Sequence, residues 1–173
     1  MVQLMKQPPA ETAFAVRPAA LADVPILARH RCEMFMEMGS LAESAYADLL
    51  AAAERYFAEA LPAGEYHAWL VAPQARPEQI VAGGGLQLRR MLPRPGPEGL
   101  LLPSGPQGLI LNMYTEPAWR RRGLASLLME TMIQWSRDHG VASLVLHASS
   151  MGRPLYAQLG FADTNEMAYS LYR

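Results

Sequence analysis

The chain of 173 residues is long enough for one domain with a full hydrophobic core and too short for two ordinary domains. Hydrophobic residues make up 51% and charged residues 18%, which is typical of globular proteins, and the formal net charge of -1 excludes a general electrostatic attraction to nucleic acid. No stretch approaches the roughly 20 apolar residues that span a bilayer, and residues 1–10 lack the apolar core of a signal peptide, so we expect neither membrane insertion nor export.

The single cysteine, Cys32, cannot form a disulfide within the chain. Its neighbours in sequence supply no metal-ligand spacing and nothing that would lower the pKa of a nucleophilic thiol. We therefore expect a packed structural thiol, no metal site and a cytoplasmic protein.

The first segments of the chain predict one strand followed by two helices. Residues 12–17 have a strand pattern that ends at Pro18. Apolar residues then recur at helical spacing over residues 24–38 and again over residues 46–61. Two helices are thus expected before the main part of the sheet.

The middle of the chain predicts an antiparallel hairpin and a long loop. Residues 66–72 and 80–89 read as two strands joined by turn-forming residues. Three consecutive glycines, beginning at Gly83, lie inside the second strand, where they indicate a bulge or a close approach of the backbone rather than a phosphate loop. Residues 91–108 are rich in proline and glycine and predict a loop.

The last third of the chain predicts a β-α-β unit, a short helix and a final strand. These elements are expected at residues 109–115, 123–139, 142–148, about 153–159 and 167–172. The fold class is therefore α/β, with a mixed, mostly antiparallel sheet, one central pair of parallel strands and helices on both faces. Residues 1–11 are expected to form an N-terminal extension and residues 12–173 a single domain.

An anion site is predicted where the strand at 109–115 is followed by the next helix. The turn residues are Arg120, Arg121, Arg122, Gly123, Leu124, Ala125 and Ser126. The start of a helix offers unpaired backbone N–H groups and the positive end of the helix dipole, and small side chains let an anion approach these amides. Arginines there are unfavourable for the dipole unless an anion is present. The pattern therefore favours binding of a group such as a pyrophosphate.

With Arg120-x-x-Gly123-x-Ala125, the sequence resembles the GCN5-related N-acetyltransferase (GNAT) superfamily, whose signature is Gln/Arg-x-x-Gly-x-Gly/Ala at the start of the central helix. The segment from Leu155 to Phe161 is similar to that family's Leu-Tyr-x-x-x-Gly-Phe element. The resemblance implies the GNAT fold, with acetyl-CoA as cosubstrate. It extends from about residue 12 to the C-terminus, although residues 108–161 carry nearly all of its specificity.

The resemblance also implies where acetyl-CoA would bind. Backbone groups of Met113, Tyr114 and Thr115 would bind the pantetheine amides, as a strand edge pairs with another strand. The turn from Arg120 to Ser126 would hold the pyrophosphate.

Two residues near the C-terminus are implied to lie at the reacting thioester. Tyr156 matches the family tyrosine whose hydroxyl protonates the leaving thiolate, although packing of a short helix is an alternative role for this ring. Ser150 stands six residues before Tyr156, at a position where many relatives have asparagine. The polar contact of that residue to acetyl-CoA or the acceptor is therefore kept, weakened or replaced in this chain.

The general base is left open. Many relatives place a glutamate on the strand before the central helix, but this chain has Asn112, which cannot take a proton at neutral pH. Glu33, His147 and a chain of water molecules are the alternatives, although a solvated helix face explains Glu33 and a structural hydrogen bond explains His147 equally well.

The expected reaction is transfer of an acetyl group from acetyl-CoA to a primary amine on a small molecule or peptide, by direct attack. A noncatalytic acyl-CoA sensor that keeps the phosphate turn is the main alternative, and a small nucleotide-binding protein is a third. Nucleic acid and membranes are not expected partners. The family often dimerises, but no feature of this sequence decides its oligomeric state.

Overall fold

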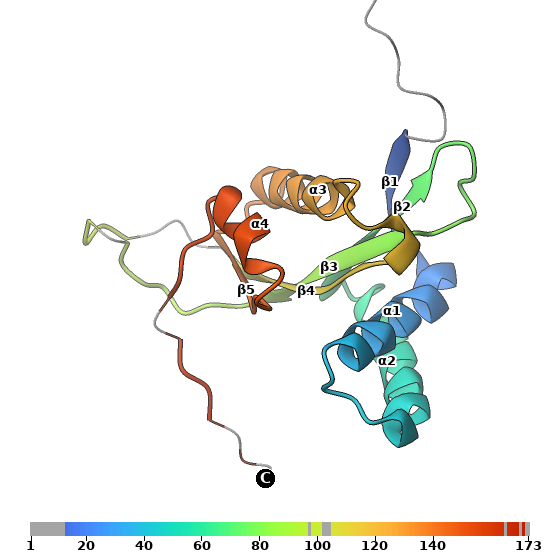
Figure 1. The fold of residues 1–173 in the computed structure, drawn as a ribbon. Coiled ribbons are helices and arrows are strands. Elements are labelled where there is room, and N and C mark those ends of the chain that lie inside the picture. The colour runs from blue at the N-terminus through green and yellow to red at the C-terminus, as the bar shows by residue number, and fades with distance from the viewer. Residues whose placement is uncertain (1–12, 97, 102–104, 165, 170, 172–173) are drawn as a thin grey trace, which may run out of the picture.

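The computed structural model describes residues 13–96, 98–101, 105–164, 166–169 and 171. One five-stranded sheet forms its centre, in the order β1-β2-β3-β4-β5 (Figure 1). The strands are β1 (Phe14–Pro18), β2 (Tyr66–Pro73), β3 (Ala82–Arg89), β4 (Gln107–Thr115) and β5 (Ser143–Leu146). The α-helices are α1 (Val24–Glu37), α2 (Tyr46–Ala60), α3 (Leu124–Asp138) and α4 (Arg153–Gln158).

The sheet is mixed, as the sequence predicts. Strands β1 to β4 pair antiparallel with their neighbours, and β4 pairs parallel with β5. The expected hairpin is present, with Tyr66 opposite Gln87 and Val71 opposite Ala82. The α/β class and the parallel strand pair are therefore confirmed.

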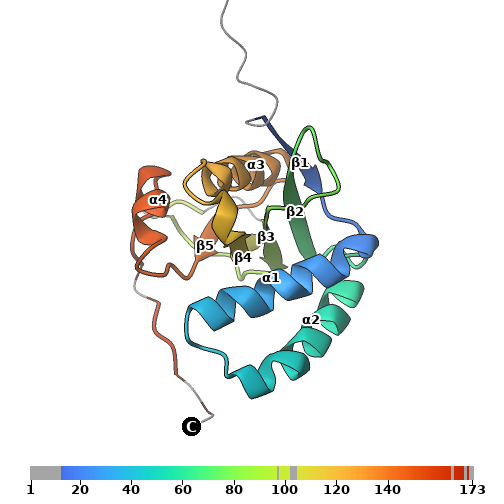
Figure 2. The same cartoon turned by 45° about the vertical axis from the view of Figure 1, so that its right-hand side comes forward.

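The helices cover both faces of the sheet (Figure 2). On one face, α1 and α2 bury an apolar cluster that includes Leu27, Phe57 and Leu70. On the other, α3 packs Leu128 and Met132 into a second cluster, against which α4 packs its partly buried side chains. Burial of the apolar stripes of these amphipathic helices gives the domain two cores, one on each side of the sheet.

The predicted boundaries differ from the structure at several strands. Strand β3 begins at Ala82 rather than at residue 80, and β5 covers only part of the predicted range 142–148. Residues 107 and 108, which were expected to be loop, begin β4 because they pair with both β3 and β5. Pro95 and Leu101 form an isolated bridge within the proline-rich segment.

The predicted final strand at residues 167–172 is wrong for the part that the structure describes. Residues 166–169 and 171 form no strand, and residues 170 and 172 lie outside the described part of the chain. Met167, Tyr169 and Leu171 are 94%, 86% and 83% exposed, so their alternation is not matched by burial. The predicted extension at residues 1–11 also lies outside the described residues. In the described part of the chain, no helix has the length and apolar character needed to cross a membrane.

Candidate active site

Strands β4 and β5 are paired over only part of the length of β4. Their parallel register runs from Gln107 opposite Ser143 to Ile110 opposite Leu146. β4 then continues to Thr115, paired with β3 alone among the described residues. On the β5 side, no described residue pairs with the backbone of residues 111–115, and such an edge can hydrogen-bond an amide-bearing ligand as it would another strand.

A bulge in β4 lies at the point where the two strands separate. Leu111 is opposite Gly85 and Tyr114 is opposite Gly83, so Asn112 and Met113 together face the single residue Gly84. Asn112 has φ of 60°, in the left-handed region that asparagine tolerates better than most residues. Its side-chain amide is buried and donates a hydrogen bond to the carbonyl oxygen of Leu27 at 3.1 Å, which fixes the bulge to α1.

The three glycines of β3 each make room for a different neighbour, as the sequence analysis anticipated. A Cβ at Gly83 would lie 3.0 Å from Nδ1 of His30. A Cβ at Gly84 would meet the sulfur of Met113, and one at Gly85 would lie 2.5 Å from the hydroxyl oxygen of Tyr66. The glycines are thus sites of close packing around the bulge.

The turn between β4 and α3 leaves the start of α3 without a side-chain cap. Arg121 has φ of 62° and Gly123 has φ of 79°, so the chain passes through two left-handed residues before α3 begins at Leu124. Gly123 is the N-cap, no side chain caps the helix, and its first turn holds no acidic residue. The amides of this helix start are therefore available to an anion.

The three arginines of the turn have different surroundings. Arg120 is held by α1: its Nη2 lies 2.6 Å from both carboxylate oxygens of Glu37, and its Nε donates to the carbonyl oxygen of Thr115 at 3.0 Å. Arg122 lies over the ring of Trp119, 4.9 Å from its centroid. Within the described part of the chain, Arg121 and Arg122 make no ion pair, and both are exposed.

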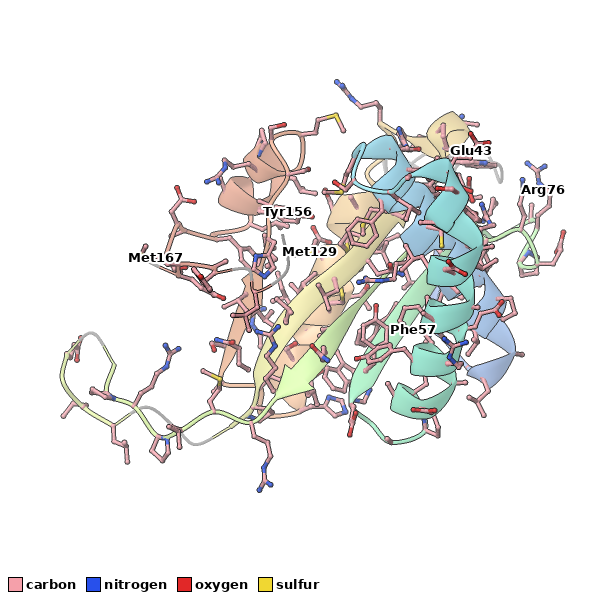
Figure 3. All side chains as sticks on the ribbon, turned by 90° about the horizontal axis from the view of Figure 1, so that it is seen from below. Glu43, Phe57, Arg76, Met129, Tyr156 and Met167 are labelled. Atoms are coloured by element: carbon pink, nitrogen blue, oxygen red, sulfur yellow. The ribbon has the colours of Figure 1, made fainter. Side chains whose placement is uncertain are left out.

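Tyr156 projects from α4 toward the core (Figure 3). Its ring is half-buried, packs against Gly152 and lies 6.1 Å from the ring of Phe161. Burial raises the pKa of the Tyr156 phenol above its usual value, so the hydroxyl stays protonated at neutral pH. No other described residue hydrogen-bonds this hydroxyl, which leaves it free to donate a proton.

The other predicted site residues are divided between the two faces of the sheet. Tyr114 is buried, and its hydroxyl donates to Glu37 of α1 at 3.3 Å. Burial, followed by the nearby carboxylates, raises the pKa of Tyr114 to about 12. Met113 packs on the opposite face, in the cluster below α3. The side chains of Tyr114 and Met113 therefore lie on opposite faces of the sheet, whereas the backbone of β4 follows the edge that β5 leaves unpaired.

Among the described residues, no hydrogen bond joins Tyr156 to Glu33 or His147. Glu33 is on α1 and accepts a hydrogen bond from the hydroxyl of Tyr46 of α2 at 2.8 Å, whereas Tyr156 packs with the core on the other face. His147 follows the last residue of β5 and is exposed, and Ser150 is exposed in the turn before α4. The catalytic roles of these residues stay predictions.

The sequence reasoning missed a buried polar cluster between α1 and β4. His30 is fully buried beside the ring of Tyr114, and its Nε2 lies 3.4 Å from Oε1 of Glu116, which also forms an ion pair with Arg29. Burial lowers the pKa of His30 to about 4, with Arg29 acting in the same direction and Glu116 opposing it. The spacing of His30 from Leu27, which places both on the apolar side of the helix, is a sequence signal that could have identified His30 as buried.

Two further features of the site concern metals and the cysteine. Among the residues that the structure describes, no group of three or more His, Cys, Asp or Glu side chains is placed to hold a metal ion. Cys32 is a buried free thiol, and burial raises its pKa. The burial of Cys32 agrees with the expected packed structural thiol.

Comparison with known proteins assigns this architecture to a family. The acetyltransferase (GNAT) family model matches residues 35–161. A GCN5-related N-acetyltransferase from Ralstonia eutropha is 30% identical, with 92% of this chain and 99% of that chain covered and a TM-score of 0.78. A predicted acetyltransferase from Clostridium acetobutylicum, whose crystal structure contains acetyl-CoA, is 25% identical, with coverage of 91% and 96% and a TM-score of 0.74.

More distant structures share the fold. Glucosamine-6-phosphate N-acetyltransferase from Arabidopsis thaliana is 15% identical, with coverage of 93% and 99% and a TM-score of 0.65. A search of curated proteins gave no significant match. The family match covers most of the chain, and the structural matches span nearly its whole length. The chain therefore belongs to the GNAT family of acetyltransferases.

Proposed function

We propose that the protein transfers an acetyl group from acetyl-CoA to a primary amine. The observation that carries the proposal is the separation of β4 from β5 after Ile110 and Leu146, next to the uncapped start of α3. A ligand with an extended, amide-bearing arm and a pyrophosphate at its end fits this arrangement. Its arm would pair with the free edge of β4, and its pyrophosphate would bind at the start of α3. Membership of an acetyltransferase family and the acetyl-CoA in the Clostridium relative support this choice.

The proposed binding mode uses mainly backbone groups. Residues 113–115 of β4 would bind the pantetheine amides along the free edge. The amides of residues 121–126 would bind the pyrophosphate, and the exposed side chains of Arg121 and Arg122 would add charge-assisted hydrogen bonds. Ser150, at the turn before α4, would supply a polar contact.

Acetyl-CoA supplies an activated acetyl group as a thioester. The nitrogen of a neutral amine attacks the carbonyl carbon, a C–N bond forms, and the C–S bond breaks as its electron pair leaves on sulfur. Tyr156 donates its phenolic proton to the departing sulfur, and the proton lost by the amine passes to a base and restores the tyrosine through solvent. Burial keeps Tyr156 protonated until it is needed. No covalent enzyme intermediate is required.

Glu33, His147 and a water chain remain the proposed routes for the amine proton. The Glu33 carboxylate is oriented by Tyr46, and burial together with this hydrogen bond raises the pKa of Tyr46 to about 12. The Tyr46 hydroxyl therefore stays protonated and donates a hydrogen bond to the Glu33 carboxylate. A further lone pair of that carboxylate would accept the proton of the amine. His147 is open to solvent at the end of β5 and would act through water.

The proposed acceptor is an amine of a small molecule or peptide, with α1 and α2 as the proposed walls of its site. The proposed location is the cytoplasm, and a homodimer is compatible with the family. A chain with this turn and no base would instead be an acyl-CoA sensor, which the experiment below distinguishes from an enzyme.

The test is release of free thiol from acetyl-CoA against a panel of small amines and peptides. Wild type, Tyr156→Phe and Tyr169→Phe are assayed in parallel, because Tyr169 is 86% exposed and serves as a matched control. We expect turnover with one amine class, a loss of about 100-fold in kcat for Tyr156→Phe with little change in acetyl-CoA affinity, and no loss for Tyr169→Phe. Thermal protection by acetyl-CoA without turnover across the panel would favour the sensor, and protection by ATP but not by CoA would favour a nucleotide-binding protein.

A further inference from the structure

Arg120 occupies the first fixed position of the signature, yet its side chain is directed to α1. Its Nη2 lies 2.6 Å from each carboxylate oxygen of Glu37, and its Nε donates to the carbonyl oxygen of Thr115 at 3.0 Å. The guanidinium also lies 5.8 Å from the ring centroid of Tyr114. These contacts fix the side chain at the end of β4.

Glu37 is the residue that receives these contacts, and it ends α1. A carboxylate at a helix C-terminus interacts unfavourably with the helix dipole, and a cation beside the carboxylate offsets this interaction. The hydroxyl of Tyr114 donates to the same carboxylate at 3.3 Å, and its raised pKa keeps it a donor. The end of α1 is thus joined to β4 at Tyr114 and to the turn at Arg120.

The ion pair is too exposed to serve mainly as a stabilising contact. The side chains of Arg120 and Glu37 are 40% and 36% exposed, and exposed pairs contribute little to the free energy of unfolding. Its effect is instead on the position of α1 relative to the turn. The two residues are 83 positions apart in sequence, so their contact joins two distant parts of the domain. The planar guanidinium adds direction to the contact, which a lysine would not.

We propose that Arg120 is a positioning residue that holds the C-terminal end of α1 against the turn, and that its side chain is not a phosphate ligand. The phosphate charge is met by Arg121, Arg122 and the helix amides. Since α1 is a proposed wall of the acceptor site, loss of the Arg120–Glu37 pair impairs use of the amine more than binding of acetyl-CoA. This inference rests on the proposed function for its kinetic part only.

The first test measures acetyl-CoA affinity by calorimetry and acceptor KM by thiol release. Arg120→Ala and Glu37→Ala are each expected to raise the acceptor KM about fivefold, and the double variant no more than either single variant. Arg120→Lys, which keeps the charge but loses the Nε bond to Thr115, is expected to recover part of the effect. The Kd for acetyl-CoA should change less than twofold in all of them, but should rise about fivefold in Arg121→Ala.

The exposed Arg137→Ala in the last turn of α3 serves as the control and should leave KM and Kd unchanged. The proposal is overturned if Arg120→Ala weakens acetyl-CoA as much as Arg121→Ala does while Glu37→Ala has no effect. It is also overturned if the acceptor effects of Arg120→Ala and Glu37→Ala add in full.

The second test is independent of catalysis and so separates this inference from the proposed function. Amide hydrogen exchange is measured on wild type, Arg120→Ala and Glu37→Ala without acetyl-CoA. We expect exchange at residues 34–38 to become about tenfold faster in both variants, with α2 unaffected. Unchanged exchange at residues 34–38 in Arg120→Ala would overturn the proposal even if no amine were ever turned over.

Discussion

Asn112 of β4 donates a hydrogen bond to the carbonyl oxygen of Leu27 in α1 at 3.1 Å while its own backbone is left-handed. This contact joins a bulge to a helix at the point where the sheet opens. Only a short polar side chain combines tolerance of positive φ with the reach to α1. The relationship therefore gives Asn112 a structural role at the point where β4 and β5 separate.

Substitutions at residue 112 should separate the two roles of the asparagine. Asn112→Ala loses the hydrogen bond and keeps the backbone strain, so it should lower the free energy of unfolding by about 2 kcal/mol. Asn112→Gly loses only the hydrogen bond and should be about 1 kcal/mol less destabilised than the alanine variant. Urea unfolding measures both, and Gln158→Ala on the exposed face of α4 is the control. Equal stability of the two variants would contradict a left-handed backbone at this position.

The glycines of β3 should differ in their sensitivity to a methyl group. Gly85→Ala places its Cβ 2.5 Å from the backbone oxygen of His67, which cannot move without breaking the hairpin, so we expect a loss of about 3 kcal/mol. Gly84→Ala meets only the flexible side chain of Met113 and should cost about 1 kcal/mol. Urea unfolding of both variants tests this order, and an equal loss would contradict the packing described for the bulge.

His30 should make stability fall as the solution becomes more acidic. Its pKa is about 4 in the folded protein and about 6.5 in an unperturbed histidine, so the unfolded chain binds the extra proton between these values. Stability is therefore present above pH 6.5 and is lost as pH falls toward 4, by about 2 kcal/mol at pH 5. Unfolding of wild type and His30→Gln at pH 7.5 and pH 5 measures this difference.

The pH comparison needs its own controls. Burial also lowers the pKa of His67, which adds a change of the same sign to both proteins and cancels in the comparison. His147→Gln, which makes the same substitution at an exposed position, is measured in parallel as the control. If His30→Gln lost as much stability as wild type between the two pH values, His30 would not be the buried neutral group described above.

Arg121 should contribute to acetyl-CoA binding without contributing to folding. Arg121→Ala and Arg121→Gly both remove the charge, and each should weaken acetyl-CoA about fivefold, which corresponds to about 1 kcal/mol. Because φ is 62° at this residue, the glycine variant should unfold at a higher temperature than the alanine variant. Calorimetry and thermal unfolding give the two readouts, and unchanged affinity in both variants would exclude the predicted phosphate contact.

Tyr156 should leave a signature in the pH dependence of turnover. Burial raises the pKa of Tyr156 above that of an ordinary tyrosine, so the acid stays protonated throughout the neutral and mildly basic range. With the best amine, kcat should not fall between pH 7 and pH 9.5. Any fall above pH 10 should be absent in Tyr156→Phe, with thermal unfolding recorded at each pH as a control. A falling limb near pH 8 in wild type alone would contradict this role.

Local patterns predicted the strand, turn and helix between residues 109 and 139 closely. Gly123 ends the turn, and the following apolar spacing defines α3, so both signals lie within a few residues of the element they specify. The contacts of Glu37 with Arg120 and of Glu116 with Arg29 were not predictable in the same way, because they span 83 and 87 positions. They depend on how α1 packs against β4, which no local periodicity records.

The final strand shows the opposite limit of sequence patterns. Alternation of Met167, Tyr169 and Leu171 is typical of a strand with one buried face, yet these side chains are more than 80% exposed. A strand is defined by backbone partners as well as by alternation, and none pairs with the described residues of this segment. Strand β3 was predicted more successfully because β2 and β4 hold it on both sides.

The short parallel pairing of β4 and β5 has a mechanical consequence. The paired stretch from Gln107 to Ile110 lies at one end of β4 and the opening at the other, so a change in the width of the opening would require rotation about the paired end. The stiffness of that hinge would then set part of the affinity for any ligand inserted in the opening. A substitution such as Gly108→Ala, where a Cβ would lie 2.7 Å from a methyl of Leu144, would thus alter ligand affinity from the end of β4 opposite the opening.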